Sequence, residues 1–437
     1  MGGPRSRNAG SKRAPAATRT ERDRIGTLEI PRRALYGIQT ARAAANLSFS
    51  GRTLGDYPLL IRALANVKIA AARANLDAGV IDARIARTLE RACRTLAASE
   101  HRRELIADPL GGGGNIGINQ NINEVIAHLA SAGARRGTPR IDPKFQVNAS
   151  QSTADVCATA ARIAIIETAR PLVAALEDCA RAYRAKARAL KHVTTLARTC
   201  LQDAQPASLG DFLSGHAAAI QRRTAALARS VRALRRVNLG GTVIGAGNGA
   251  PPAYRRAILR RLREATGLDL AARANLFDAA QNCDDLGAVA AELGMLAEAM
   301  IKIAQDLRLL SSGPKGGFGE IILPAVQEGS SFFPGKINPV VPESLIQCCF
   351  QVLGHERAAR LALERGELNL NVFEGAAAIN ILDACAILER ATRLFTTRCV
   401  DGIRANEPRC AALAACALPE PQHTGALRQH RRTNRAG

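Results

Sequence analysis

Residues 150–190 read SQSTADVCATAARIAIIETARPLVAALEDCARAYRAKARAL, and this stretch decides the fold class. Its apolar side chains recur every three and four residues with few helix breakers among them, which predicts one long amphipathic helix. The same spacing occurs at residues 208–237, 284–312 and 338–364. Helices of this length exceed the globular average, and they usually form a bundle in which their faces bury one another or a partner subunit.

The composition agrees with a helical protein. Hydrophobic residues make up 47% of the 437 residues, which is enough for a sizeable core, but aromatic residues make up only 3% and tryptophan is absent. Alanine and leucine, two of the dominant residues, are strong helix formers, and small side chains suit close packing of helices. Shorter helices are predicted at residues 59–78, 82–99, 119–132 and 376–397. We therefore expect an all-α, or mainly α, fold.

Changes in composition divide the chain into four predicted parts. Residues 1–24 are rich in Gly, Ser, Ala and Arg and are interpreted as a disordered basic arm. Residues 25–149 mix short helices with turns, which indicates a helical N-terminal domain. Residues 150–405 form the predicted central domain of long helices. Residues 406–437 are too short and too polar for a domain and are interpreted as a truncated C-terminal remnant and tail.

The charge is strongly basic, with 60 Lys and Arg residues against 38 Asp and Glu residues and a formal net charge of +22. Such an excess is typical of proteins that bind nucleic acid, acidic partners or anionic substrates. Much of it lies near the two ends, and no aromatic residues interleave with the arginines, which argues against a base-stacking surface. Solvated helix faces and basic tails explain most of the charge. Nucleic-acid binding through the terminal arms remains an alternative.

The eleven cysteines contain no CxxC pair, and most lie within apolar helical stretches. This pattern favours buried, reduced thiols of a cytosolic protein over a disulfide framework or a zinc site. The N-terminus lacks the apolar stretch of a secretory signal, and no segment is long and apolar enough to span a membrane. We therefore expect a soluble, cytoplasmic protein with no membrane partner and no metal ligands.

The most distinctive segment is residues 329–339, GSSFFPGKINP, which joins two predicted helices. It brings two serines, a lysine and an asparagine together with Gly and Pro. A flexible loop with hydroxyls, backbone N–H groups and one cation is what a site for an anion requires. Taken alone, the segment would more often be an ordinary loop between helices, so its interpretation depends on the rest of the chain.

This loop resembles the signature of the aspartase/fumarase superfamily, in which two serines precede a Pro-Gly-Lys-x-Asn-Pro run. Further motifs of that family occur in the right order along nearly the whole chain after the arm. They are the N-terminal motif at residues 35–42 (LYGIQTAR), the first, second and third substrate-loop motifs at residues 119–124 (NQNINE), 147–153 (VNASQST) and 197–204 (ARTCLQDA), and the lead-in to the serine loop at residues 306–314 (DLRLLSSGP). Within the superfamily, residues 306–314, 339–343 and 366–374 resemble aspartases more closely than fumarases, argininosuccinate lyases or adenylosuccinate lyases.

The resemblance implies a fold and an activity. The expected fold is an aspartase/fumarase-like elongated long-helix bundle with a helical N-terminal domain and a truncated C-terminal domain. The expected activity is elimination of ammonia from L-aspartate to give fumarate, without a cofactor. Because the substrate loops of the family come from different subunits, the resemblance also implies a homotetramer with composite active sites and a small dicarboxylate substrate.

Removal of a C3 proton requires that the carbanion be held as a doubly charged aci-carboxylate, so the site needs a base and preorganised donors. By resemblance Ser330 is the base, and N–H groups and positive charge must favour its alkoxide. The other residues implied as catalytic are Lys336, Thr199 and Glu343. The residues implied as substrate-binding are Arg42, Asn119, Ser152, Thr153, Lys336 and Asn338. Helix capping is the alternative role for Ser152, Thr153 and Thr199.

Four features depart from the family pattern. Ile116-Gly117 stands where the first loop usually has a pair of small hydroxyl residues, Ala154 replaces an Asn, and Cys200 replaces a His or Gln. The compact domain that normally follows Pro408 is expected to be absent. Losing one charge-assisted hydrogen bond costs roughly 1.5–3 kcal/mol. A fumarase-like or other C2-substituted succinate lyase, or a catalytically impaired oligomeric paralogue, therefore remains an alternative.

Overall fold

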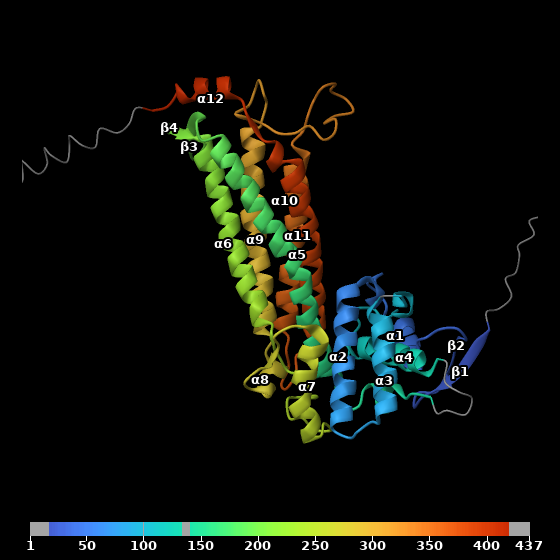
Figure 1. Ribbon diagram of the computed structural model, residues 1–437. Helices are drawn as coiled ribbons and strands as arrows, with labels where there is room; N and C mark the ends of the chain where they lie inside the picture. Colours follow the sequence, from blue (N-terminus) through green and yellow to red (C-terminus); the bar gives the residue numbers. More distant parts are fainter. Residues whose placement is uncertain (1–16, 99, 133–139, 419–437) are drawn as a thin grey trace, which may run out of the picture. The chain divides into compact units, whose positions relative to one another are not determined.

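The computed structural model describes residues 17–98, 100–132 and 140–418, and the protein is mainly α-helical, as predicted (Figure 1). Each sheet in the described part of the chain has two strands. The chain folds into two compact units, and each unit is assembled from three separate stretches. The first unit comprises residues 1–164, 235–283 and 365–376, and the second comprises residues 165–234, 284–364 and 377–437.

The first unit begins with a hairpin of β1 (Thr18–Arg22) and β2 (Thr27–Pro31), which pair antiparallel. The prediction of a disordered arm is therefore wrong for residues 18–22, which form strand β1. The hairpin is ordered because the guanidinium of Arg19 donates to the carbonyl oxygens of Ala34 and Tyr36, at 2.7 and 2.6 Å. The remainder of the predicted arm, residues 1–16, lies outside the described residues.

The helical core of the first unit is centred on α2 (Pro58–Asp77), which packs against α3 (Ala83–Ala97) and α7 (Pro252–Thr266). Proline at the first position of α2 suits a helix start, and the Asp82 side chain caps α3 by accepting the Ile85 N–H at 2.8 Å. The other elements of this unit are α1 (Ile38–Leu47), η1 (Leu54–Asp56), η2 (Arg102–Glu104), α4 (Ile116–Ser131), η3 (Pro143–Val147), the start of α5 (Thr153–Ala189), β5 (Arg236–Val237), β6 (Ala271–Ala272) and α8 (Leu276–Gln281).

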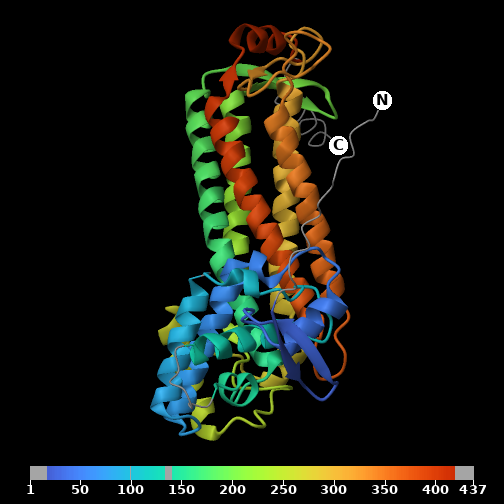
Figure 2. The same cartoon turned by 90° about the vertical axis from the view of Figure 1, so that its right-hand side faces the viewer.

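The second unit is a bundle of long helices. In it α9 (Asp284–Leu310) packs against α10 (Val340–Leu363) and α6 (Leu209–Ala233), and it runs beside the corresponding parts of α5 and α11 (Glu374–Arg398) (Figures 1 and 2). Buried leucine and isoleucine side chains along α9 form the apolar contact surface inside the bundle. At one end of the bundle lie β3 (Thr194–Thr199), β4 (Gln202–Ser208), β7 (Ile321–Ile322), η4 (Val400–Gly402), β8 (Arg404–Ala405) and α12 (Glu407–Ala414).

The long helices predicted at residues 150–190, 208–237, 284–312 and 338–364 are confirmed as α5, α6, α9 and α10. Helix α12 lies within the stretch interpreted as a C-terminal tail, where it buries Cys410 completely. Residues 419–437 of that predicted tail lie outside the described residues. In the described part of the chain, no helix has the length and apolar character needed to cross a membrane.

Candidate active site

The residues singled out from the sequence fall into two groups, one in each unit. The first unit holds Arg42, Asn119, Ser152 and Thr153. The second unit holds Thr199, Ser330, Lys336, Asn338 and Glu343.

The hydroxyl of Ser330 is surrounded by backbone donors of its own loop. Its Oγ accepts the N–H of Phe332 at 3.0 Å and the N–H of Phe333 at 2.9 Å. Hydrogen bonds donated to an oxygen favour its negatively charged form, so these two N–H groups stabilise an alkoxide at this position. The Ser330 side chain is only half-buried, which leaves it open to a small molecule.

The loop that bears Ser330, residues 329–339, is closed at its neck. The N–H of Gly329 donates to the Lys336 carbonyl oxygen at 2.7 Å, and the side-chain amide of Asn338 donates to the Gly329 carbonyl oxygen at 2.7 Å. A Cβ atom at Gly329 would lie 2.6 Å from the Asn338 nitrogen and 2.6 Å from the Lys336 oxygen. Asn338 therefore uses one donor to hold the loop together.

The ammonium group of Lys336 is exposed and forms no hydrogen bond or ion pair with the residues that the structure describes. Its charge is therefore available to an anion. The neighbouring rings of Phe332 and Phe333 are 81% and 59% exposed and meet edge to face, with centroids 4.9 Å apart.

Glu343 lies in the first turn of α10, and its Oε1 is 3.4 Å from Nε of Arg308 on α9. The pair joins the helix that follows the loop to the helix that precedes it. Among the described residues, the ion-pair partner of Glu343 is therefore Arg308 of the bundle.

Thr199 is the last residue of strand β3 and is exposed; it does not cap a helix. The hairpin turn consists of Cys200 and Leu201, with φ values of 52° and 61°. Positive φ at both positions is the geometry of a type I′ turn, which matches the twist of the flanking strands. The departure at Cys200 therefore lies at the exposed tip of a hairpin.

The hairpin is anchored to the segment that leads into the serine loop. Arg198 Nη1 donates to Glu320 Oε1 at 2.6 Å, and its guanidinium lies 4.2 Å from the centroid of the Phe318 ring. Glu320 is fully buried and also accepts a hydrogen bond from the Thr195 hydroxyl. Sequence reasoning did not single out Glu320, because its partners lie more than a hundred residues away.

In the first unit, the first and second predicted substrate motifs meet at Asn148. Its Oδ1 accepts from Lys68 Nζ at 2.8 Å, from Asn119 Nδ2 at 3.1 Å and from Asn123 Nδ2 at 3.2 Å. The Asn119 amide also donates to Thr153 Oγ1 at 2.9 Å. The predicted pair Asn119 and Thr153 is therefore in direct contact.

Lys68 is the functional candidate that sequence reasoning missed. Its side chain is 2% exposed, and burial lowers the pKa of its ammonium to about 8. The only signal in the sequence is a lysine within the apolar stretch of residues 60–72. Near it, the buried Oδ1 atoms of Asn119 and Asn123 have no hydrogen-bond partner among the described residues. These oxygens can accept hydrogen bonds from a ligand.

Ser152 takes part in capping α5. Its Oγ accepts the N–H of Ala154 at 3.3 Å, and its N–H donates to Asp155 Oδ1 at 2.9 Å. Asp155 is fully buried, which raises the pKa of its carboxyl, and its Oδ2 accepts the N–H groups of Gly240 and Thr242 at 3.0 and 3.1 Å. The alternative role in capping thus has direct geometric support for Ser152.

Arg42 already has a carboxylate partner within its own chain. Its Nε and Nη2 donate to the two oxygens of Asp23, at 2.9 and 3.0 Å, and Nη2 also donates to the Gly26 carbonyl oxygen at 3.1 Å. The hydrogen bond from Arg42 lowers the pKa of Asp23 to about 2, so this carboxylate stays ionised near neutral pH. The geometry assigns Arg42 to holding residues 23–26 and not to a free substrate contact.

A single carboxylate links the N-terminal motif to the first substrate motif. Glu124, which is 6% exposed, accepts the N–H groups of Gly37, Gln39 and Thr40 at 2.8, 3.0 and 3.1 Å. These donors lie at the start of α1, where a negative charge interacts favourably with the helix dipole. Glu124 therefore ties the start of α1 to α4.

Two further departures lie at helix starts. Ile116 and Gly117 begin α4, where the Ile116 side chain is 39% exposed, and Ala154 lies in the first turn of α5.

Within the described residues, no group of three or more His, Cys, Asp and Glu side chains is placed to hold a metal ion.

Comparisons with known proteins add to this geometry. A protein family described as Lyase matches residues 26–354. The aspartate ammonia-lyase of Helicobacter pylori is 41% identical over 395 residues, which cover 90% of this chain and 84% of the relative. A crystal structure of fumarate lyase:delta crystallin from Brucella melitensis bound to cobalt matches with a TM-score of 0.88 and 41% identity, over 91% of this chain and 87% of that one. A class II fumarase from Schistosoma mansoni matches with a TM-score of 0.87 and 29% identity, over the same shares of the two chains.

Proposed function

We propose that this chain, which belongs to the lyase family of the aspartase/fumarase superfamily, eliminates ammonia from L-aspartate to give fumarate. The chain is a carbon–nitrogen lyase of the aspartate ammonia-lyase type, because relatives of that name match about nine-tenths of its length at about 40% identity. The choice of L-aspartate and the roles of individual residues are our proposal.

The observation that carries the proposal is the pair of N–H groups directed at Ser330 Oγ. In the proposed reaction the Ser330 alkoxide takes a proton from C3 of the substrate, and the electron pair of the C–H bond moves into the neighbouring carboxylate. The resulting aci-carboxylate then re-forms the carboxylate as the C2–C3 double bond forms and the C2–N bond breaks. Ammonia and fumarate leave, and Ser330 holds the proton until it returns to solvent.

Binding of the substrate requires groups of both signs. We assign a substrate carboxylate to the ammonium of Lys336, which has no partner among the described residues. The substrate's own ammonium is a hydrogen-bond donor. The Oδ1 atoms of Asn119 and Asn123, which have no hydrogen-bond partner among the described residues, are acceptors for it in the proposed site. The hydroxyl groups of Ser152 and Thr153 complete the proposed substrate contacts from the same cluster.

We further propose that the active form is a homotetramer in which each site draws on more than one subunit. The bundle helices carry large apolar side chains that are well exposed in the single chain. Phe350 on α10 is 55% exposed and Leu394 on α11 is 47% exposed. A partner subunit that covered these side chains would remove apolar surface from water.

Among the eleven free cysteines all except Cys200 and Cys416 are buried, which supports the expected reducing, cytoplasmic setting.

A fumarase-like reaction is the second candidate, because the class II fumarase of S. mansoni matches the fold with a TM-score of 0.87. The two reactions share the base and the aci-carboxylate and differ in the group that leaves C2. The departures at Ala154 and Cys200 change hydrogen-bonding capacity near two of the proposed substrate loops.

The test is a panel of C2-substituted succinates, including L-aspartate and L-malate, added to the purified full chain while fumarate absorbance is followed. We expect fumarate to form from L-aspartate in clear preference to the other compounds. Formation from L-malate alone would replace ammonia by hydroxide as the leaving group. No fumarate from any compound would contradict the proposal and favour a catalytically impaired protein.

A further inference from the structure

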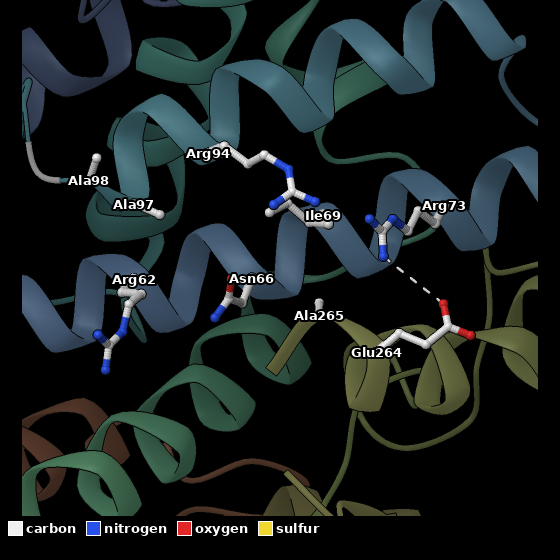
Figure 3. A pocket seen from close by; sticks show the side chains of 9 residues that line it. All are labelled: Arg62, Asn66, Ile69, Arg73, Arg94, Ala97, Ala98, Glu264 and Ala265. Carbon is white, nitrogen blue, oxygen red and sulfur yellow. Dashed lines mark ion pairs between the residues drawn. The ribbon is translucent and has the colours of Figure 1, made fainter. Parts of the chain in front are cut away.

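A pocket of about 380 Å3 lies within the first unit, between α2, α3 and α7 (Figure 3). None of the predicted active-site residues lines it. Its charged lining consists of Arg62 and Arg73 from α2, Arg94 from α3 and Glu264 from α7. Three of the lining side chains are cationic and one is anionic, and a second carboxylate, Glu90, contacts two of the arginines.

Two of these arginines are held in place by Glu90, which does not itself line the pocket. Nε and Nη2 of Arg73 donate to the two Glu90 oxygens at 3.0 and 2.5 Å, and Nε and Nη2 of Arg94 donate to Oε1 at 3.2 and 2.6 Å. The hydrogen bonds from Arg73 and Arg94 lower the pKa of Glu90 to about 2, so it stays ionised. Both guanidinium groups are thus oriented before any ligand arrives.

This arrangement leaves donors without acceptors at the pocket. Arg73 Nη1 is 4.0 Å from the nearest oxygen of Glu264, which is beyond hydrogen-bond distance (Figure 3, dashed line). Arg94 Nη1 and the carboxamide of Asn66 form no hydrogen bond with the part of the chain that is described. Glu264 is itself engaged by Arg261 at 2.8 Å, so it does not neutralise the pocket fully.

The remainder of the lining is apolar and small. Ile69 of α2, Ala97 and Ala98 at the end of α3, and Ala265 of α7 form this part of the wall. The volume falls within the range of about 300–1,000 Å3 that small-molecule sites occupy. The pocket therefore combines an oriented set of cationic donors with a surface for a compact carbon skeleton.

We propose that this pocket binds a small molecule through a doubly charged oxyanion, either a phosphate group or a pair of carboxylates. Guanidinium groups match the oxygen spacing of both anions and form charge-assisted hydrogen bonds with them. The Asn66 amide adds a neutral donor beside the two arginines. The site is separate from the residues proposed for elimination, so it stands or falls independently of that reaction.

The test is calorimetric titration of the full chain with inorganic phosphate and, in a second arm, with succinate. Two variants remove the recognition: Arg94→Gln, at a side chain that is 63% exposed, and Asn66→Asp, which adds a negative charge with little change of shape. Arg87→Gln is the matched control, because Arg87 is an exposed arginine of α3 that does not line the pocket. We expect at least one probe to bind the wild type and to bind both variants about tenfold more weakly, with Arg87→Gln unchanged.

If the pocket variants weaken the binding of phosphate, the natural ligand carries a phosphate group. If they weaken the binding of succinate, the natural ligand carries two carboxylates. Succinate that binds elsewhere on the protein is recognised because the pocket variants leave its affinity unchanged. Fumarate formation by Arg94→Gln in the absence of either probe should equal that of the wild type. Binding of neither probe to the wild type, or equal affinity of both probes for the wild type and both variants, would overturn the proposal.

Discussion

The backbone N–H of Gly329 donates a hydrogen bond to the carbonyl oxygen of Lys336, with 2.7 Å between nitrogen and oxygen. This contact closes residues 329–336 into a loop, so the proposed base at Ser330 and the proposed carboxylate-binding cation at Lys336 belong to one closed structural element. The two N–H groups that stabilise the Ser330 oxygen lie within the same loop. The proposed roles of Ser330 and Lys336 therefore depend on the geometry of this neck.

Gly329→Ala is expected to lower kcat without removing any functional group. An added Cβ atom would lie 2.6 Å from two backbone atoms, so the neck must open and the Ser330 hydroxyl must move. Steady-state kinetics on L-aspartate measure the effect. Gly215→Ala on α6 is the control, because Gly215 is exposed and a Cβ there would meet nothing within 4 Å. Unchanged kcat in Gly329→Ala would show that the closed neck is unimportant.

Glu124→Gln is expected to loosen the start of α1. The neutral amide keeps one acceptor oxygen for the three N–H groups of Gly37, Gln39 and Thr40, and leaving a buried donor unsatisfied costs about 1–3 kcal/mol. Hydrogen exchange at these three amides should become roughly tenfold faster or more. The exposed Glu298→Gln on α9 should leave the three rates unchanged. Equal rates in wild type and Glu124→Gln would contradict the capping role.

Lys68 gives a prediction on pH and stability. The pKa of its ammonium is lowered by burial from 10.5 to about 8 in the folded chain. Below about pH 8 both states hold the proton and the cost of burying the charge is fully present. Between about pH 8 and 10.5 the unfolded state holds a proton that the folded state has lost, so stability rises with pH.

The measurement for Lys68 is the difference in urea midpoint between the wild type and Lys68→Met across this pH range. The difference should shift in favour of the wild type as pH rises from about 8, because Lys68→Met lacks the titrating group. The exposed Lys302→Met serves as the control and should show no such shift. A pH-independent difference for Lys68→Met would mean that the ammonium is not desolvated.

Mixing inactive variants tests the proposed composite sites. Ser330→Ala and Thr153→Ala alter residues of different units, and each should be inactive when assembled alone. If subunits exchange and sites draw on more than one chain, the mixture contains some sites with neither change, and part of the activity returns. A mixture of Ser330→Ala with Lys336→Ala should stay inactive, because both changes lie in one loop. Activity in neither mixture would count against sites shared between subunits.

The sequence predicted the long helices well, because the spacing of apolar residues is a local property. It did not predict that the compact units would be discontinuous, because that depends on which distant helices pack together. The predicted arm extended too far, since the partners of Arg19 that order its strand are backbone carbonyl oxygens, which leave no mark in a residue pattern.

The candidate site was predictable to a similar degree. The serine loop could be singled out because its residues lie within one short segment. The hydrogen bond between Asn119 and Thr153 shows that two of the predicted residues are neighbours, while their role in binding stays a prediction. The partner of Arg42 was missed because Asp23 lay in the stretch assigned to the arm. Lys68 was missed because a lone lysine in an apolar helix gives no sign of whether its ammonium reaches solvent or a buried amide.

The most direct test of the central claim is kcat for fumarate formation by Ser330→Ala, measured with L-aspartate as the substrate that the wild type converts. A positioned general base contributes about a hundredfold to ten-thousandfold to the rate. We expect a loss within that range for Ser330→Ala and no loss for Ser214→Ala, whose exposed hydroxyl donates to the Asp211 carbonyl oxygen of its own helix. A Ser330→Ala variant that keeps the wild-type kcat would contradict the assignment of Ser330 as the base.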